Sequence, residues 1–162
     1  MPNQEAIKWF LNEVWSAIIA KEPTATFHIA GKNMSEDIIN LAASTKGVVN
    51  EGEVENANDF INKNNIMVVP LFSGSGMRIK IIEAMAMEKL VIGTSVAFEG
   101  IAVQHNKNGI IANTANEFKE AILMCLQHPE VVTSIGQKAR KTIEEQYNNT
   151  VIVKQLINFI AE

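Results

Sequence analysis

The residues of this sequence whose types and spacing could do chemistry together lie between positions 74 and 83. The loop Gly74-Ser75-Gly76 is followed by two cations, Arg78 and Lys80, and by one carboxylate, Glu83. Glycines let a backbone come close to a ligand, and the N-terminus of a helix presents free N–H groups to negative charge. This pattern predicts an anion site in which Glu83 could also accept hydrogen bonds from adjacent hydroxyl groups.

The glycine loop does not match the two common nucleotide-binding motifs. A dinucleotide fingerprint needs a third glycine where this sequence has Ile79, and no Gly-Lys-Ser/Thr follows as a P-loop would require. A plain turn before a helix, with Lys80 and Glu83 forming a surface ion pair three residues apart, explains the same residues. On the loop alone, both interpretations stay open.

The elements that must position these residues form one repeating unit. An apolar β-branched run, 66–69, ends at Pro70, a helix is expected over 77–87, and a second apolar strand is expected over 90–93. A strand, a glycine loop, a helix and a strand in this order are typical of α/β proteins. On a helix spanning 77–87 the spacing would place Gly76, Lys80 and Glu83 on one face near its start.

The remaining elements extend this alternation along most of the sequence. Further strands are expected over 26–30, 48–52 and 109–112, and further helices over 4–21, 35–43, 56–63, 114–127, 130–146 and 150–161. The strands are short, rich in Val and Ile, and apolar on both faces, which predicts a Rossmann-like parallel sheet with helices on both faces. Such a fold normally opens with a strand, so we expect one strand to be missing ahead of the first helix.

Composition narrows the classes of function. The sequence has 162 residues, which suits one domain, and its net charge of −4 argues against an extended nucleic-acid surface. Cys125 is the one cysteine, and we interpret it as a buried inert thiol. No apolar run is long enough to span a membrane and no signal peptide is evident, so a cytoplasmic location is the expectation. His28, His105 and His128 match no metal-ligand spacing.

The run Gly74 to Ala86 resembles the donor-site motif of group 1 glycosyltransferases with the GT-B fold. Further segments are similar to other parts of that family, namely 27–31, 90–95, 99–101, 108–112, 118–129 and 136–147. The resemblance covers nearly the whole chain. It identifies residues 1–162 as a single C-terminal domain that binds the nucleotide-sugar donor, with the N-terminal acceptor domain absent.

The resemblance also implies how the sheet is arranged. The first strand of the family's C-terminal domain is absent here, and in that fold it lies in the middle of the sheet. We expect either that the remaining strands close up or that a neighbouring chain fills the gap and so forms an oligomer. An intact six-stranded parallel sheet within one chain would contradict this expectation.

The implied function is that of half of a retaining glycosyltransferase. The whole enzyme would move a sugar from a nucleotide diphosphate to a polysaccharide, lipopolysaccharide or glycolipid acceptor, without a cofactor or a bound metal. It would work in the cytoplasm, where association with the inner face of the membrane is compatible with such acceptors. The isolated domain should be inactive because half of the active site is missing.

The resemblance assigns roles to individual residues. It implies that Glu83 binds the ribose hydroxyls and that the Gly74-Ser75-Gly76 backbone approaches the diphosphate or the sugar. Arg78 and Lys80 are the catalytic candidates, because cations can stabilise a leaving nucleotide diphosphate. Many members carry a glutamate where this sequence has Ser75, so the sugar contacts of that glutamate do not carry over. Glu99 fits a donor contact and a surface acid about equally well.

Two other functions fit parts of the same pattern. A sugar-nucleotide epimerase with the GT-B fold would use a similar diphosphate site. A receiver-type or flavodoxin-like interaction domain would share the α/β alternation, but a receiver needs aspartates clustered at strand ends. Asp37 and Asp59 both lie outside the expected strands, which disfavours that alternative.

Overall fold

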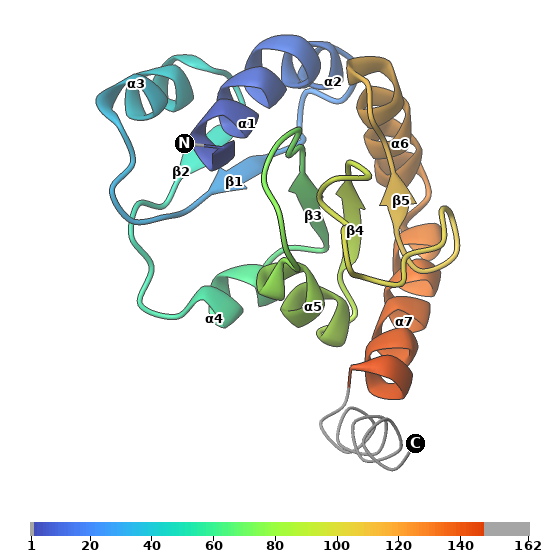
Figure 1. Cartoon of the computed structure of the whole chain (residues 1–162). Coiled ribbons are helices and arrows are strands. Elements are labelled where there is room, and N and C mark those ends of the chain that lie inside the picture. The colour runs from blue at the N-terminus through green and yellow to red at the C-terminus, as the bar shows by residue number, and fades with distance from the viewer. Residues whose placement is uncertain (1, 148–162) are drawn as a thin grey trace.

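The structure is a computed structural model that describes residues 2–147, and it alternates helices with short strands (Figure 1). The helices are α1 (Pro2–Phe10), the π-helix η1 (Leu11–Trp15), α2 (Ser16–Lys21), α3 (Glu36–Ser44), α4 (Ala57–Asn62), α5 (Ile79–Ala86), α6 (Ala115–Gln127) and α7 (Pro129–Gln146). The strands are β1 (Phe27–Ile29), β2 (Val48–Asn50), β3 (Ile66–Val69), β4 (Leu90–Gly93) and β5 (Ile110–Ile111). The helix predicted over 150–161 lies outside the described residues.

The strands are all parallel but form two separate sheets. β1 pairs with β2, whereas β3, β4 and β5 form a second sheet with β4 in the centre. The predicted parallel α/β architecture is therefore confirmed. Within residues 2–147 no strand joins β1 to β3, so the expectation that the remaining strands close up into one sheet is wrong for the chain by itself.

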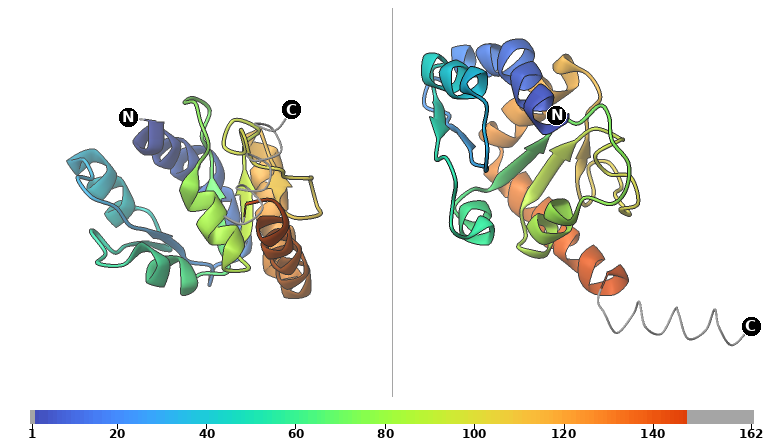
Figure 2. Two further views of the ribbon diagram at one scale, coloured as in Figure 1. Left: turned by 60° about the horizontal axis from the view of Figure 1, so that its bottom comes forward. Right: turned by 60° about the vertical axis from the view of Figure 1, so that its left-hand side comes forward.

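Helices cover both faces of the three-stranded sheet, as the sequence predicted. Ile66 and Val68 of β3 point into a core shared with α1, η1, α2 and α6. Met67 and Val69 point to the opposite side, into a core shared with α4, α5 and α7. The right-hand view of Figure 2 shows α1 above the strands and α5 below them. Successive side chains of a strand point to opposite faces, so an apolar run without polar positions needs both layers.

The first predicted helix is one continuous rod with a π-helical middle, running from Pro2 to Lys21. Phe10 and Trp15 are buried in the core, and the indole N–H of Trp15 donates to the Lys46 carbonyl at 2.8 Å. Trp9 packs edge-on against Phe72, with ring centroids 4.6 Å apart. These aromatic residues anchor the helix against the core, and Trp9 links α1 to the loop that follows β3.

Two helix starts differ from the prediction. The helix expected over 77–87 begins at Ile79, because Gly76 has a φ of +83° and Arg78 is extended with a φ of −90° and a ψ of 95°. The helix expected over 130–146 begins one residue earlier, at Pro129, and remains separate from α6, which ends at Gln127. Proline has no N–H group to lose at that position, and its fixed φ suits the first turn of a helix.

Candidate functional site

The glycine loop lies at the carboxyl edge of the three-stranded sheet, between β3 and α5. In open α/β sheets, ligands bind in the crevice outside the carboxyl ends of the strands. The loop after β4 is tied to the same edge, because the buried Thr94 hydroxyl donates to the Leu71 carbonyl and the Thr94 N–H donates to the Val69 carbonyl at 3.3 Å. The fold therefore places the predicted residues where this class of sheet binds ligands.

The loop is shaped by its two glycines and by Arg78. Gly74 and Gly76 have φ values of +117° and +83°, which L-residues with side chains rarely adopt. The Arg78 guanidinium donates from Nη1 to the Ser75 carbonyl at 2.8 Å and to the Gly76 carbonyl. A Cβ atom added at Gly74 would lie 2.8 Å from Nη2 of Arg78. The loop thus wraps around the guanidinium and holds it close to the backbone.

Lys80 and Glu83 form an ion pair on α5. The Lys80 Nζ lies 2.6 Å from Oε2 of Glu83, and their side chains are 56% and 32% exposed. The structure thus has the ion pair that the surface-pair interpretation predicts. The prediction that Gly76 shares their helix face is wrong, because α5 begins at Ile79 and Gly76 belongs to the loop.

The loop after β4 forms a second wall beside the glycine loop. A Cβ atom added at Gly100 would lie 3.6 Å from Cε of Met77, so these two loops are in contact. Glu99, the neighbour of Gly100, is exposed. The structure therefore brings the loop of Glu99 next to the glycine loop, as the donor-contact interpretation needs, and it assigns no ligand contact to the Glu99 carboxylate.

A third strand end completes the edge, with residues that were not among the predicted site residues. The amide side chain of Asn113, after β5, accepts a hydrogen bond from the Ser95 N–H at 2.9 Å. Glu117 accepts hydrogen bonds from the N–H groups of Asn113 and Thr114, at 2.6 and 3.1 Å. These bonds, above all the one from Asn113, hold the pKa of Glu117 below its usual range. In the sequence, the motif Thr-x-x-Glu at Thr114 and Glu117, before an apolar run, is the signal that predicts this helix cap.

The buried thiol of Cys125 lies away from this edge. Burial raises the pKa of the Cys125 thiol to about 12, which agrees with the predicted inert thiol. Among residues 2–147, no group of three His, Cys, Asp or Glu side chains is placed to hold a metal ion. None of the helices in the described part of the chain has both the length and the apolar character to cross a membrane.

A cavity of about 770 Å³ lies at the opposite, amino edge of the sheets. Its lining includes Thr26 ahead of β1, Asn64 ahead of β3 and Lys89 ahead of β4. None of the predicted site residues lines it. The 770 Å³ cavity and the predicted site residues therefore lie at opposite edges of the sheets.

A curated relative and two solved structures resemble the chain. A protein of Klebsiella pneumoniae, described as an uncharacterized 44.6 kDa protein in a cps region, is 26% identical over 164 residues, with 96% of this chain and 42% of the relative covered. The chain thus spans less than half the length of that relative.

The solved structures are those of S. aureus TarM and of the C-terminal domain of a glycosyl transferase group 1 family protein, LpcC, from Francisella tularensis. TarM, crystallised with Fondaparinux, alpha-GlcNAc-glycerol and UDP, matches with a TM-score of 0.80 and 21% identity, covering 98% of this chain and 33% of TarM. The LpcC domain matches with a TM-score of 0.71 and 17% identity, covering 90% of this chain and 79% of the domain.

At these identities the two structural matches show that the fold is shared. The model of the family described as glycosyl transferases group 1 matches residues 1–128, which is most of the chain. On that match, this chain belongs to the group 1 glycosyl transferases.

Proposed function

We propose that this chain is the nucleotide-sugar-binding half of a retaining glycosyltransferase. The observation that carries the proposal is the joint placement of the glycine loop, the start of α5 and three charged side chains at the carboxyl edge of a parallel sheet. Free N–H groups at the start of a helix favour a phosphate, and flanking cations add to that preference. The acceptor of the whole enzyme would be a polysaccharide, a lipopolysaccharide or a glycolipid.

Donor binding would require an exchange of partners on α5. In the structure, Glu83 is paired with Lys80 at 2.6 Å. A ribose offers two adjacent hydroxyl groups to a carboxylate, and a diphosphate offers charged oxygens to an ammonium group. Glu83 would turn to the ribose and Lys80 to the diphosphate, so both ions of the pair keep a partner of opposite or complementary character.

Arg78 would act on the same diphosphate from the loop. Its guanidinium already lies against the carbonyls of Ser75 and Gly76, and its remaining N–H groups can reach an anion held by the loop backbone. As the sugar leaves the nucleotide, negative charge grows on the diphosphate, and fixed cations and backbone N–H groups stabilise that charge. Arg78 and Lys80 are the proposed catalytic residues of this half, and Glu99 is a further proposed donor contact.

Two of the comparisons support the proposed domain organisation. The chain spans 42% of its Klebsiella relative and matches a domain named as the C-terminal domain of LpcC. We therefore interpret residues 1–162 as a C-terminal donor-binding domain whose acceptor-binding partner domain lies elsewhere in the whole protein. The whole enzyme would work in the cytoplasm, at the inner face of the membrane when its acceptor is a lipid.

Calorimetric titration of the chain with UDP, GDP and ADP tests the proposal, beginning with UDP because TarM was crystallised with that nucleotide. We expect one nucleotide to bind and Glu83→Ala to weaken it by about tenfold, the value of one charged hydrogen-bonding interaction. Glu145→Ala is the matched control, because Glu145 pairs with Lys141 at 3.8 Å on α7 and takes no part in the proposed site. Equal affinities of wild type and Glu83→Ala would contradict the assigned role.

A further inference from the structure

The loop after β4 carries Glu99 and forms the second wall of the proposed donor site. It leaves the sheet at Thr94, whose hydroxyl is bonded to the loop after β3, and it reaches the next strand, β5, at Ile110. Irregular backbone of this kind is mobile unless other elements hold it by hydrogen bonds or packing. The position of the wall therefore depends on the contacts that the loop makes between these two points.

The Tyr147 hydroxyl binds two backbone groups of this loop. It accepts a hydrogen bond from the Ala102 N–H at 2.8 Å and donates one to the Gly100 carbonyl at 3.2 Å. A phenol can do both at once because its oxygen is a donor and an acceptor, whereas a phenyl ring can do neither. One side chain thus provides partners for two backbone groups that would otherwise need water.

Tyr147 is itself held in place by α7. Its N–H donates to the Ile143 carbonyl at 2.9 Å, so its backbone is bonded to the last turn of the helix. Its side chain packs against the buried apolar cluster that includes Ile101 and Ile143. The helix therefore presents the hydroxyl to the loop from a fixed position.

A second clamp acts on the same part of the loop. The buried Asn108 amide donates to the Ala102 carbonyl at 3.0 Å and to the Thr142 hydroxyl of α7 at 2.8 Å. Both backbone groups of Ala102 are therefore bound, its N–H to Tyr147 and its carbonyl to Asn108. These bonds connect the loop to the carboxyl-terminal part of α7.

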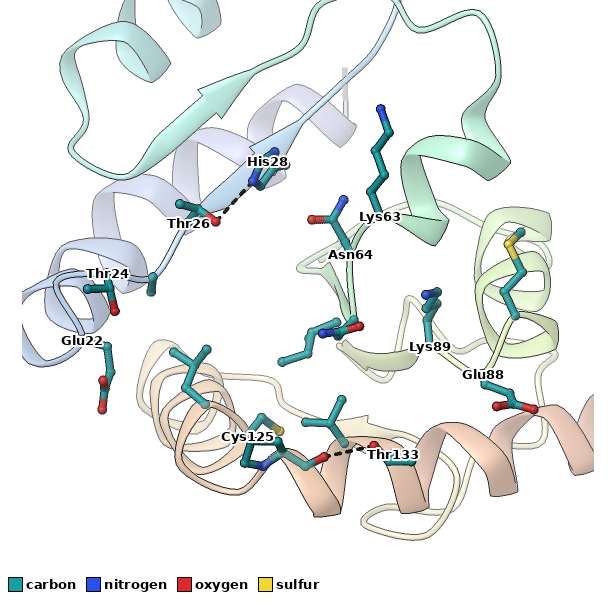
Figure 3. Close-up of a pocket in the computed structure, with 17 residues that line it drawn as sticks. Glu22, Thr24, Thr26, His28, Lys63, Asn64, Glu88, Lys89, Cys125 and Thr133 are labelled. Carbon is teal, nitrogen blue, oxygen red and sulfur yellow. Dashed lines mark hydrogen bonds between the residues drawn. The ribbon is translucent and has the colours of Figure 1, made fainter.

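The same helix contacts the element that carries Lys80 and Glu83. Arg140 of α7 pairs with the Glu88 carboxylate, in the turn after α5, at 3.2 Å. Figure 3 shows Glu88 lying against α7. α7 thus reaches from the end of α5 to the loop of Glu99, and it holds the two elements that flank the proposed site.

Gly100 is both a residue that Tyr147 binds and the point where the loop touches the glycine loop. A Cβ atom added at Gly100 would lie 3.6 Å from Cε of Met77, and its φ of +76° lets the backbone turn there. A shift of Gly100 would change its approach to the glycine loop and the direction of its neighbour Glu99. A change at Tyr147 would therefore reach the proposed site through these two residues.

We propose that Tyr147 is a positioning residue for donor binding. Its hydroxyl holds the backbone of Gly100 and Ala102, and so keeps the second wall, with Glu99, in the geometry that a nucleotide sugar requires. Tyr147 acts through the loop and not by contact with the substrate. This inference rests on the proposed function, and it extends the donor site to the end of α7.

Tyr147→Phe tests the proposal because it removes the hydroxyl and keeps the ring. Thr133→Val is the matched control, since it removes a hydroxyl from the same helix, where Thr133 donates to the Pro129 carbonyl at 3.2 Å and lines the amino-edge cavity. Isotopically labelled wild type and both variants are titrated with UDP, GDP and ADP, and amide NMR shifts give the affinity and the place of binding. Thermal unfolding gives the stability of each chain.

We expect Tyr147→Phe to weaken binding of the nucleotide that wild type prefers by about fivefold, the value of one hydrogen bond. At saturation, the shift that the nucleotide causes at Gly100 should shrink more than the shift at Gly74, because the glycine loop keeps its own contacts. Thr133→Val should bind as wild type does. A role in stability alone would lower the unfolding temperature of Tyr147→Phe and leave its affinity and its pattern of shifts unchanged.

Two results would overturn this inference while leaving the proposed donor site intact. One is wild-type affinity and shifts in Tyr147→Phe when wild type itself binds at the glycine loop. The other is equal weakening in Thr133→Val, because the loss of any hydroxyl from α7 would then suffice. If no nucleotide shifts Gly74 and Gly76 in wild type, the proposed function itself is overturned, and this inference with it.

Discussion

At the scale of single residues, the proposed binding groups already have partners within the protein. Glu83 is held by Lys80 at 2.6 Å, and the Arg78 guanidinium is held by two loop carbonyls. An exposed ion pair of this kind contributes little to stability, about 0.2–0.5 kcal/mol on a helix. A ligand could therefore separate Lys80 from Glu83 at small cost, which suits the proposed donor site.

Substitutions of Arg78 separate the effect of its charge on nucleotide binding from the effect of its planar shape. We expect Arg78→Lys to lower nucleotide affinity by about tenfold, nearly as much as Arg78→Ala, because a lysine keeps the charge but cannot donate the planar fork that holds the loop. Calorimetric titration of both variants with the nucleotide that binds wild type measures this. Wild-type affinity in Arg78→Lys would show that the charge alone matters and that the loop contacts do not.

The residues of the proposed site were predictable from the sequence, but the contacts among them were not. The identities of Gly74, Gly76 and Glu83 already indicated a loop and a carboxylate near a helix start. The sequence could not show that Arg78 folds back on its own loop, because that contact depends on the positive φ angles of both glycines. The sequence spacing placed Gly76 on the helix face of Lys80 and Glu83. Spacing alone does not reveal that Gly76 and Arg78 have non-helical backbone angles.

At the scale of elements, α7 packs closely against the turn between α5 and β4. A Cβ atom added at Gly136 would lie 2.0 Å from the carbonyl oxygen of Glu88, so no side chain fits there without moving the helix. Arg140, one turn further along α7, pairs with the Glu88 carboxylate at 3.2 Å. The glycine thus lets α7 approach the end of the helix that carries Glu83.

Gly136→Ala should destabilise the protein by about 1–3 kcal/mol, because the added methyl group overpacks this contact. Urea unfolding of wild type and variant measures the difference. Gly31→Ala is the control, since a Cβ atom at Gly31 meets nothing within 4 Å and this glycine does not need a positive φ. Equal stability of Gly136→Ala and Gly31→Ala would show that α7 does not pack as closely against Glu88 as it does in the structure.

The start of α6 should make stability depend on pH. Thr114 and Glu117 form a capping box, and the hydrogen bond from the Asn113 N–H is the largest cause of the lowered pKa of Glu117. A carboxyl whose pKa is lower in the folded state stabilises it above its unfolded pKa, about 4.3, and loses that contribution as pH falls through the folded value.

Glu117→Gln should therefore flatten the fall in stability between about pH 5 and pH 3, where an unperturbed glutamate titrates. Thermal unfolding of both proteins across that range measures it, and Glu120→Gln, an exposed change on the same helix, is the control. Parallel stability curves for wild type and Glu117→Gln would refute the role assigned to the capping carboxylate.

At the scale of the whole molecule, the order of elements was predictable and the sheet connection was not. Strands 66–69 and 90–93 were expected with the bounds that the structure has, because short Val- and Ile-rich runs between turn residues are strong signals. Whether β1 and β3 would pair depends on two segments about 40 residues apart and on what lies between them. Local sequence patterns carry no information on that contact.

The chain by itself should bind a nucleotide diphosphate and transfer no sugar. The proposed site supplies the donor side alone, and catalysis needs both reactants positioned together. Incubation of this 162-residue chain with a UDP-sugar and a lipid or saccharide acceptor, followed by detection of the labelled product, measures transfer, with the whole protein as the positive control. Product formed by the isolated chain would contradict the proposed division of the active site.

We propose that the nucleotide binds at the carboxyl edge and not in the larger cavity at the amino edge. Titration of the isotopically labelled chain with UDP, followed by amide NMR shifts, separates these two positions within one experiment. We predict that the amides of Gly74, Gly76 and Gly100 shift first and that Glu83→Ala reduces the shifts at a given UDP concentration. Shifts confined to Thr26, Asn64 and their neighbours around the amino-edge cavity would contradict the account.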